Sequence, residues 1–227
     1  MLALGLSAVT AFVQRQEANL NRSGAMELVV EADDPPADAA AGRDLNILLL
    51  GSDSRDGENE QIGGADSGQR ADTTIVMHVS ADRDRVEMVS IPRDSLVDIP
   101  ACRMADGSTT SPQPGEMINK AFQIGWKHGG TTDTERQDSA IACAVSTVQE
   151  NTGLRIDHFV VVDFVGFQDM VTALGGVDIC IEQDLKDPKY TGLDLRAGMH
   201  HLNGVEALQL ARARHVLGSD GMDPSRI

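Results

Sequence analysis

Short apolar runs separated by polar turns dominate the chain between residues 45 and 91. Residues 45–50 (LNILLL) are almost wholly apolar and end at Gly51, which is typical of a buried strand. Residues 73–80 and 85–91 are rich in β-branched side chains, and the polar turn 81–84 joins them. The pattern therefore predicts one strand followed by a β-hairpin.

Helix signals dominate the second half of the chain. Thr132 and Glu135 have the spacing of a capping box, and Gly153 suits a helix end, so a long helix is predicted between them. A second polar pair of the same spacing, at residues 203–206, predicts a capped helix that runs to about residue 213.

Strands and helices alternate between these two helices. Residues 158–162 and 177–181 have the composition of strands. Between them lies an apolar stripe at helical spacing, which we assign first to the core: Phe164, Phe167, Met170, Val171 and Leu174. This alternation, together with the hairpin, predicts an α/β fold, namely a three-layer α/β/α domain with a central mixed β-sheet.

The N-terminal part of the chain differs from this domain in composition. Residues 1–13 are apolar and uncharged but shorter than the roughly 20 residues of a membrane span. They form either a helix packed on the domain or the outer half of a membrane anchor. Residues 26–30 are predicted to form a short strand, and residues 31–43 read as an acidic Pro/Ala linker, so the domain spans residues 44–227.

Composition narrows the class of protein. A chain of 227 residues can bury a full core, and with only 3% aromatic residues that core must be mainly aliphatic. The net charge of -16 argues against nucleic-acid binding, which requires cations that neutralise phosphates. A local group of arginines therefore stands out against an acidic background.

The three cysteines give information on the redox compartment in which the protein is located. Cys102, Cys143 and Cys180 lack the paired spacing of a metal site. In an exported protein we expect one disulfide and one free thiol, whereas all three would be reduced in the cytosol. We expect Cys102 to pair with Cys143, because Cys180 lies in an apolar strand pattern where a buried free thiol is common.

Charged residues occupy the ends of the predicted strands. If the hairpin forms, and the first strand runs antiparallel to it, three strand ends meet at one edge of the sheet. The residues brought to this edge are Asp53, Arg55, Arg70, Asp72, Arg93 and Asp94.

This mixture of carboxylates and guanidiniums suits a metal ion bound to a multiply charged phosphate. Magnesium takes oxygen ligands, usually one or two carboxylates together with phosphate and water. Arginine meets phosphate oxygens with a planar fork, and phosphoryl transfer depends mainly on positioning and charge neutralisation. The alternative interpretation is that the aspartates are turn and cap residues and the arginines their surface partners.

Six motifs follow one another in residues 46–227: LLLGSDSR, RADTT, SIPRD, HFVVVDF followed by GF, MVTALGGVDICI, and LNGVEALQLARAR. In this order they resemble the LytR–CpsA–Psr family of cell-wall glycopolymer transferases. Members of that family hold a polyprenyl-linked, pyrophosphate-bearing glycan and pass its phosphoglycan to peptidoglycan.

The resemblance implies an Mg2+-dependent phosphotransferase with a polyprenyl-pyrophosphate-linked glycan as donor and a peptidoglycan hydroxyl as acceptor. It implies that Asp53 and Asp72 hold the metal ion, and that Asp94 either orients Arg93 or acts as the base. The residues implied to bind the pyrophosphate are Arg55, Arg93, Arg212 and Arg214, with Arg70 a weaker candidate.

The resemblance also bears on the ends of the chain and on its location. Because the family's domain follows a membrane anchor, it favours an anchor remnant within residues 1–30 and a domain on the extracytoplasmic face of the cell membrane or in the cell wall. In the family an Arg-Gln-rich helix follows the position of Ile227, so we expect the C-terminal end of the domain to be missing. In the family a cavity beside the sheet takes the polyprenyl chain, so residues of the 164–174 stripe are candidates for its lining.

Two alternative functions stay open. The same site would serve a hydrolase that releases phosphate from a lipid pyrophosphate, with water in place of the sugar hydroxyl. A non-catalytic polyprenyl-phosphate-binding or regulatory domain would bind the lipid without metal-dependent turnover.

Overall fold

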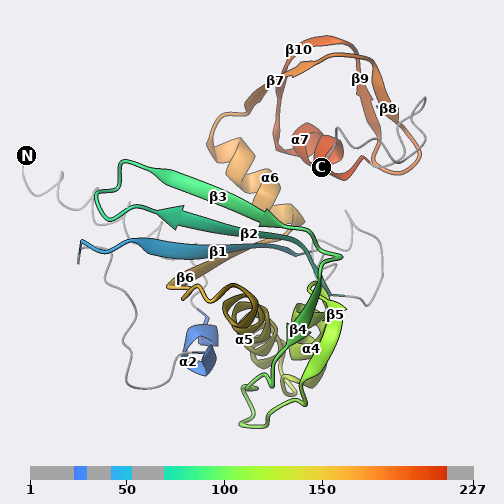
Figure 1. The fold of residues 1–227 in the computed structure, drawn as a ribbon. Helices are drawn as coiled ribbons and strands as arrows, with labels where there is room; N and C mark the ends of the chain where they lie inside the picture. The colour runs from blue at the N-terminus through green and yellow to red at the C-terminus, as the bar shows by residue number, and fades with distance from the viewer. Residues whose placement is uncertain (1–22, 30–41, 53–68, 214–227) are drawn as a thin grey trace, which may run out of the picture. The chain divides into compact units, whose positions relative to one another are not determined.

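The computed structural model describes residues 23–29, 42–52 and 69–213, which form both strands and helices (Figure 1). Contacts within the chain divide it into two compact units. The first unit consists of residues 1–46, 78–86 and 94–158, and the second of residues 47–77, 87–93 and 159–227.

A four-stranded sheet, most of which belongs to the second unit, has the strand order β3-β2-β1-β6. Its strands are β1 (Leu45–Ser52), β2 (Ala71–Val79), β3 (Val86–Ile91) and β6 (His158–Val162). Figure 1 shows β2 running opposite to both β1 and β3. The α/β class and the mixed central sheet predicted from the sequence are confirmed.

The predicted hairpin is present as β2 and β3, joined by a polar turn. The Ser80 N–H donates to the Arg85 carbonyl oxygen over 3.0 Å, and Ser80 Oγ donates to Asp82 Oδ1 over 2.6 Å. Arg83 adopts a φ of 66° in this turn, and its Nη1 donates to the Ser80 carbonyl oxygen over 2.7 Å. Local hydrogen bonds thus fix the turn that brings the two strands together.

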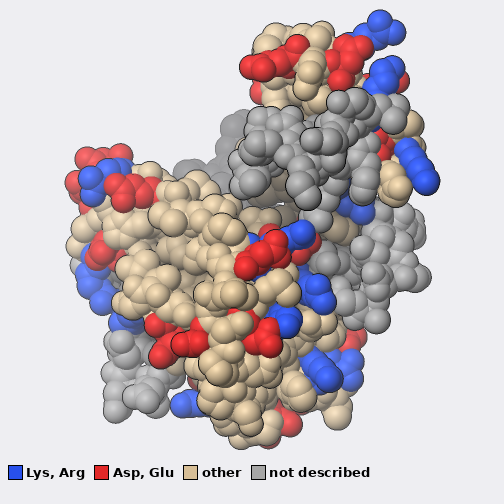
Figure 2. All heavy atoms as spheres, turned by 45° about the vertical axis from the view of Figure 1, so that its right-hand side comes forward, with Lys and Arg blue, Asp and Glu red and all other residues tan. Residues whose placement is uncertain are grey.

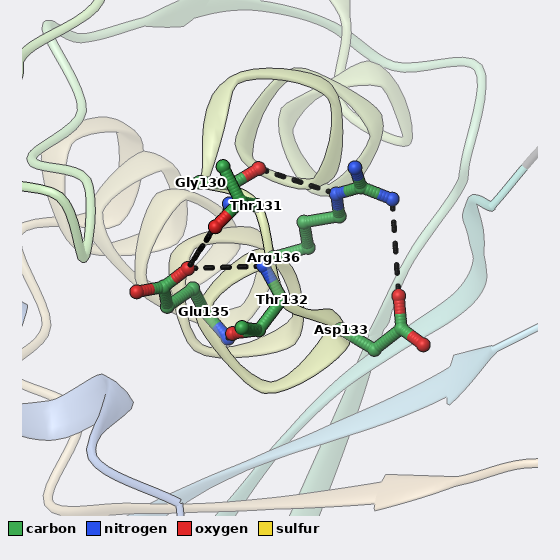
Figure 3. A network of polar contacts seen from close by, with 6 residues as sticks. All are labelled: Gly130, Thr131, Thr132, Asp133, Glu135 and Arg136. Carbon is green, nitrogen blue, oxygen red and sulfur yellow. Dashed lines mark hydrogen bonds and ion pairs between the residues drawn. The ribbon is translucent and has the colours of Figure 1, made fainter.

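Helix α5 (Asp133–Thr152) begins and ends where the sequence predicts. The Thr132 side chain accepts from the Glu135 N–H, and the Glu135 carboxylate accepts from the Thr132 N–H in return (Figure 3). At its C-terminus Gly153 adopts a φ of 68°, the left-handed conformation that favours glycine.

Helix α4 (Lys120–His128) packs closely against α5 in the first unit. A Cβ added at Gly125 would lie 2.3 Å from the Ser139 carbonyl oxygen, so any larger residue would force the two helices apart. Strand β5 (Gln113–Met117) precedes α4 and pairs antiparallel with β4 (Leu96–Ile99). The composition of residues 113–115 (QPG) is typical of a loop, and they form a strand because β4 offers an antiparallel partner.

The predicted disulfide is confirmed. Cys102 and Cys143 are bonded, with their Cα atoms 5.1 Å apart. Both side chains are buried, in a small core with Ile99, Met104 and Ala121. The bond therefore links the β4–β5 region to α5 within the first unit.

The N-terminal expectations are partly corrected. Residues Ala25–Val29 form a short helix, α2, instead of the predicted strand. Ser23 Oγ accepts from the Ala25 N–H and donates to Asp138 Oδ1 on α5, and Ala25 is fully buried, so local capping and packing on α5 favour the helix. No helix among the described residues is long and apolar enough to cross a bilayer. Residues 1–13, which carry the anchor expectation, lie outside the described ranges.

The second unit also contains two helices and two separate pairs of antiparallel strands. These elements are α6 (Phe164–Ala173), β7 (Val177–Ile181), β8 (Leu185–Asp187), β9 (Leu193–Leu195), β10 (Gly198–Leu202) and α7 (Gly204–Arg212). Strand β7 pairs with β10 and β8 with β9. Their apolar residues form one core: Val171, Ile181, Leu193, Leu195, Leu202, Ala207 and Ala213. The composition of residues 186–198 is typical of a loop, and the pairing of β8 with β9 turns part of this segment into strands.

The apolar stripe of α6 is only partly core. Val171 is buried and Phe167 packs against the core, whereas Met170 and Leu174 expose 47% and 74% of their surface. Cys180 is free, as expected, but it is exposed and not buried. The reason is the two-sided strand β7, in which Ile181 faces the core and Cys180 the opposite side.

His201 links β10 to β7 and to the end of α6. Its Nδ1 lies 2.7 Å from Asp178 Oδ1, and its Nε2 lies 2.8 Å from the Gly175 carbonyl oxygen. The hydrogen bond to Asp178, and after it the bond to Gly175, raises the pKa of His201 because both partners favour the imidazolium.

We therefore expect His201 to stabilise the fold more at low pH. Since the folded pKa is raised, the contribution is complete below the unfolded pKa of about 6.5 and is lost as the pH rises through the folded pKa. The melting-temperature difference between the parent and His201→Gln should be larger at about pH 5.5 than at about pH 9. An equal difference at both pH values would contradict this assignment.

Candidate functional site

The hairpin brings an acidic and a basic residue together at one end of the sheet. Asp72 is the second residue of β2, and Arg93 lies two residues beyond the end of β3. Because these strands are antiparallel neighbours, the start of one meets the end of the other. Arg93 Nη1 lies 3.2 Å from Asp72 Oδ2, so the structure brings together two of the residues that the sequence assigned to the site.

This ion pair is partly exposed to solvent. The Arg93 and Asp72 side chains expose 38% and 27% of their surface. A pair of this kind contributes about 0–1 kcal/mol to stability. The sheet therefore does not depend on it, and both charges remain within reach of a ligand.

Two other predicted site residues flank this pair in the chain. Arg70 is exposed and directly precedes β2, and Asp94 is exposed in the turn that follows β3. Asp53 and Arg55 lie outside the described residues, so their placement at this edge stays a prediction, and so does the pyrophosphate-binding role of Arg214, which also lies outside them. Strand β1 ends at Ser52, at the end of the sheet where β2 begins (Figure 1).

Arg212, the last residue of α7, lies over an aromatic ring. Its Cζ atom is 4.4 Å from the centroid of Phe164, the first residue of α6. The sequence analysis assigned Phe164 first to the core, with its stripe as a candidate lining of the lipid cavity, and did not predict this contact. The two residues lie 48 positions apart in the sequence, so no local pattern links them.

Two polar residues at the start of α4 add a further observation in the first unit. Lys120 forms an ion pair with Glu116 of β5. Asn119 is almost fully buried, with 4% of its surface exposed. Its Oδ1 atom has no hydrogen-bond partner in the described structure. A buried amide oxygen of this kind is costly unless another group satisfies it.

The described acidic residues of the site offer few ligands for a magnesium ion. Asp72 supplies one partly exposed carboxylate among the described residues, and Mg2+ needs only one or two carboxylates when phosphate and water complete its shell. No group of three or more His, Cys, Asp or Glu residues in the described ranges is arranged to hold a metal. The donor chemistry therefore agrees with a metal held jointly by protein and phosphate.

Positive and negative side chains are mixed on the face of the molecule that is drawn in Figure 2. Figure 2 shows Lys and Arg side chains interspersed with Asp and Glu on this face. A nucleic-acid surface requires clustered cations that neutralise successive phosphates. The face drawn in Figure 2 shows mixed and not clustered charges.

The model of the LytR_cpsA_psr family matches residues 10–227 of the chain. The chain belongs to this family. The LytR_cpsA_psr protein described here is 33% identical to the probable cell wall biosynthesis protein LcpB of Corynebacterium glutamicum over 220 residues, which cover 94% of this chain and 45% of LcpB.

A further relative and a solved structure are also similar to the chain. The polyisoprenyl-teichoic acid–peptidoglycan teichoic acid transferase TagU of Oceanobacillus iheyensis is 33% identical, with 75% of this chain and 43% of TagU covered. Bacillus subtilis TagT, solved with a bound octaprenyl pyrophosphate lipid, has the same fold with a TM-score of 0.55 at 24% identity, over 86% of this chain and 66% of TagT. The chain spans less than half the length of the curated relatives it matches.

Proposed function

We propose that this LytR_cpsA_psr domain transfers a phosphoglycan from a polyprenyl-pyrophosphate carrier to a hydroxyl of peptidoglycan during cell-wall assembly. The observation that carries the proposal is the Asp72–Arg93 pair of 3.2 Å at the sheet end. Family membership supports it, since relatives carry the names of cell-wall biosynthesis and teichoic acid transfer proteins.

The described residues fit defined parts of this reaction. Arg93 and Arg212 supply guanidiniums that neutralise the pyrophosphate, joined in the proposal by Arg55, Arg214 and, more weakly, Arg70. Asp72, with Asp53, supplies carboxylate oxygens for a magnesium ion. When bound, Mg2+ would offset the negative charge on the phosphoryl oxygens.

The transfer is an exchange at one phosphorus atom. The acceptor hydroxyl oxygen attacks the phosphorus that carries the glycan, and the bond from this phosphorus to the bridging oxygen of the pyrophosphate breaks. Polyprenyl phosphate leaves with the bridging oxygen, and the glycan gains a phosphodiester link to peptidoglycan. The proton of the hydroxyl passes to a base, for which Asp94 is the candidate.

The test is the dependence of lipid release on the acceptor. The purified protein is incubated with a lipid-pyrophosphate-linked glycan and Mg2+, with and without peptidoglycan, and polyprenyl phosphate is quantified. We expect release only when peptidoglycan is present. Equal release without peptidoglycan would favour a hydrolase, and binding without release would favour a non-catalytic domain.

We also propose that the domain lies on the extracytoplasmic face of the cell membrane. The Cys102–Cys143 disulfide supports this location, because disulfides persist mainly in oxidising compartments. The exposed thiol of Cys180 provides a native reporter. A maleimide that cannot cross membranes should label the protein in intact cells, and Cys180→Ser should abolish the labelling. Labelling that appears only after lysis would contradict the location.

A further inference from the structure

Helices α6 and α7 pack antiparallel at close range within the second unit. Near the start of α7, a Cβ added at Gly204 would lie 2.3 Å from the Gln168 carbonyl oxygen and 2.8 Å from Thr172 Oγ1. At the opposite end of α7, Arg212 lies over Phe164 at the start of α6. The two contacts fix the relative placement of the helices at both ends of the pair.

The backbone that carries Phe164 is held firmly. Asp163 caps α6, and its Oδ1 accepts from the Gly166 N–H over 2.7 Å. One turn further along, Phe167 packs against the core, and the buried Val171 belongs to it. The half-buried ring of Phe164 therefore sits at a defined position beneath the guanidinium.

An aromatic ring is a suitable support for a guanidinium that binds phosphate. The ring attracts the cation through its face and uses none of the five N–H donors, which lie in the plane of the guanidinium. A carboxylate partner, such as Asp72 beside Arg93, accepts from these donors and adds a negative charge. The Phe164 ring contacts the Arg212 guanidinium without adding a negative charge that would repel a pyrophosphate.

We propose that Phe164 is a positioning residue of the transfer reaction, whose ring orients Arg212 toward the pyrophosphate of the donor. The inference rests on the proposed function, in which Arg212 neutralises that pyrophosphate. A long, flexible side chain loses conformational freedom when it binds a ligand, and holding it in place beforehand reduces that loss. The ring therefore contributes to donor affinity, and its effect falls on KM more than on kcat.

The test compares two soluble lipid phosphates on matched variants. Phe164→Leu keeps an apolar side chain and removes the ring, whereas Phe164→Trp keeps an aromatic face. With the purified protein, we expect Phe164→Leu to weaken binding of farnesyl pyrophosphate by about 3- to 30-fold. Binding of farnesyl monophosphate should weaken less, and Phe164→Trp should bind both lipids as the parent does. The melting temperature of each variant shows whether it is folded.

A double-mutant cycle decides whether the effect passes through Arg212. In an Arg212→Met background the same Phe164→Leu change should have little further effect, because the cation that the ring orients is gone. The cycle compares the effect of Phe164→Leu in two backgrounds, so a loss of stability that is equal in both backgrounds cancels out. Additive effects of the two changes would overturn the inference.

The remaining outcomes separate this inference from the proposed function. An equal loss of affinity for both lipids would show that Phe164 contacts the lipid chain instead, and would overturn its positioning role. Unchanged farnesyl pyrophosphate binding by Phe164→Leu, in a parent that binds it tightly, would overturn only the inference. A parent that binds neither lipid would contradict the proposed function itself.

Discussion

Asp72→Asn should reduce magnesium-dependent turnover by about a hundredfold or more at low magnesium, while the protein stays folded. The change keeps the size of the side chain and removes one negative charge. Its ion pair with Arg93 is partly exposed and contributes about 0–1 kcal/mol, so the melting temperature should change little. The loss should fall on ion affinity, and through it on charge neutralisation in the transition state.

A magnesium titration separates the two members of the pair. Higher magnesium should partly restore the turnover of Asp72→Asn, because the weakened ion site refills by mass action. Arg93→Ala should not respond, because it removes a phosphate contact at every magnesium concentration. Parent-like turnover of Asp72→Asn at low magnesium would show that Asp72 is a turn residue and not a metal ligand.

The second large effect concerns the disulfide. Replacing both Cys102 and Cys143 by alanine should lower the free energy of unfolding by about 4 kcal/mol, because the crosslink spans 41 positions and restricts the unfolded chain. Chemical denaturation measures this loss. Cys180→Ser is the matched control, since it removes an exposed free thiol, and its midpoint should stay close to that of the parent. An equal loss in the control would contradict a stabilising role for the crosslink.

Local signals predicted the elements whose ends are fixed by their own side chains. The Thr132–Glu135 and Asn203–Glu206 boxes each mark a helix start, and both boxes form in the structure. The β2–β3 hairpin was predicted from two β-branched runs joined by a polar turn, and local bonds form in that turn: Arg83 Nη1 donates to the Ser80 carbonyl oxygen and Ser80 Oγ accepts from the Arg85 N–H. In these places the short-range pattern and the fold agree.

Elements that depend on distant partners escaped the sequence pattern. Residues 113–117 contain Pro114 and Gly115, a composition typical of a loop, yet they form β5 because Leu96–Ile99 offers an antiparallel partner. The three-residue strands β8 and β9 are likewise too short to show a periodicity of their own. Tertiary hydrogen bonding, which composition does not reveal, creates these strands.

The candidate site likewise contains one contact that the sequence predicted and one that it did not. The Asp72–Arg93 pair was predictable, because hairpin geometry places the start of one strand beside the end of the other. The contact of Arg212 with Phe164 was not, because an apolar residue at helical spacing is typical of a core. Only the packing of α7 on α6 reveals the second role of this ring.

The proposed function is tested most directly by detecting the covalent bond that the reaction would form between the phosphoglycan and peptidoglycan. After incubation of the protein with donor, peptidoglycan and Mg2+, muropeptides are released and their masses measured. The proposed function predicts muropeptides that carry the intact phosphoglycan, in an amount equal to the polyprenyl phosphate produced. Unmodified muropeptides together with free phosphoglycan would contradict it.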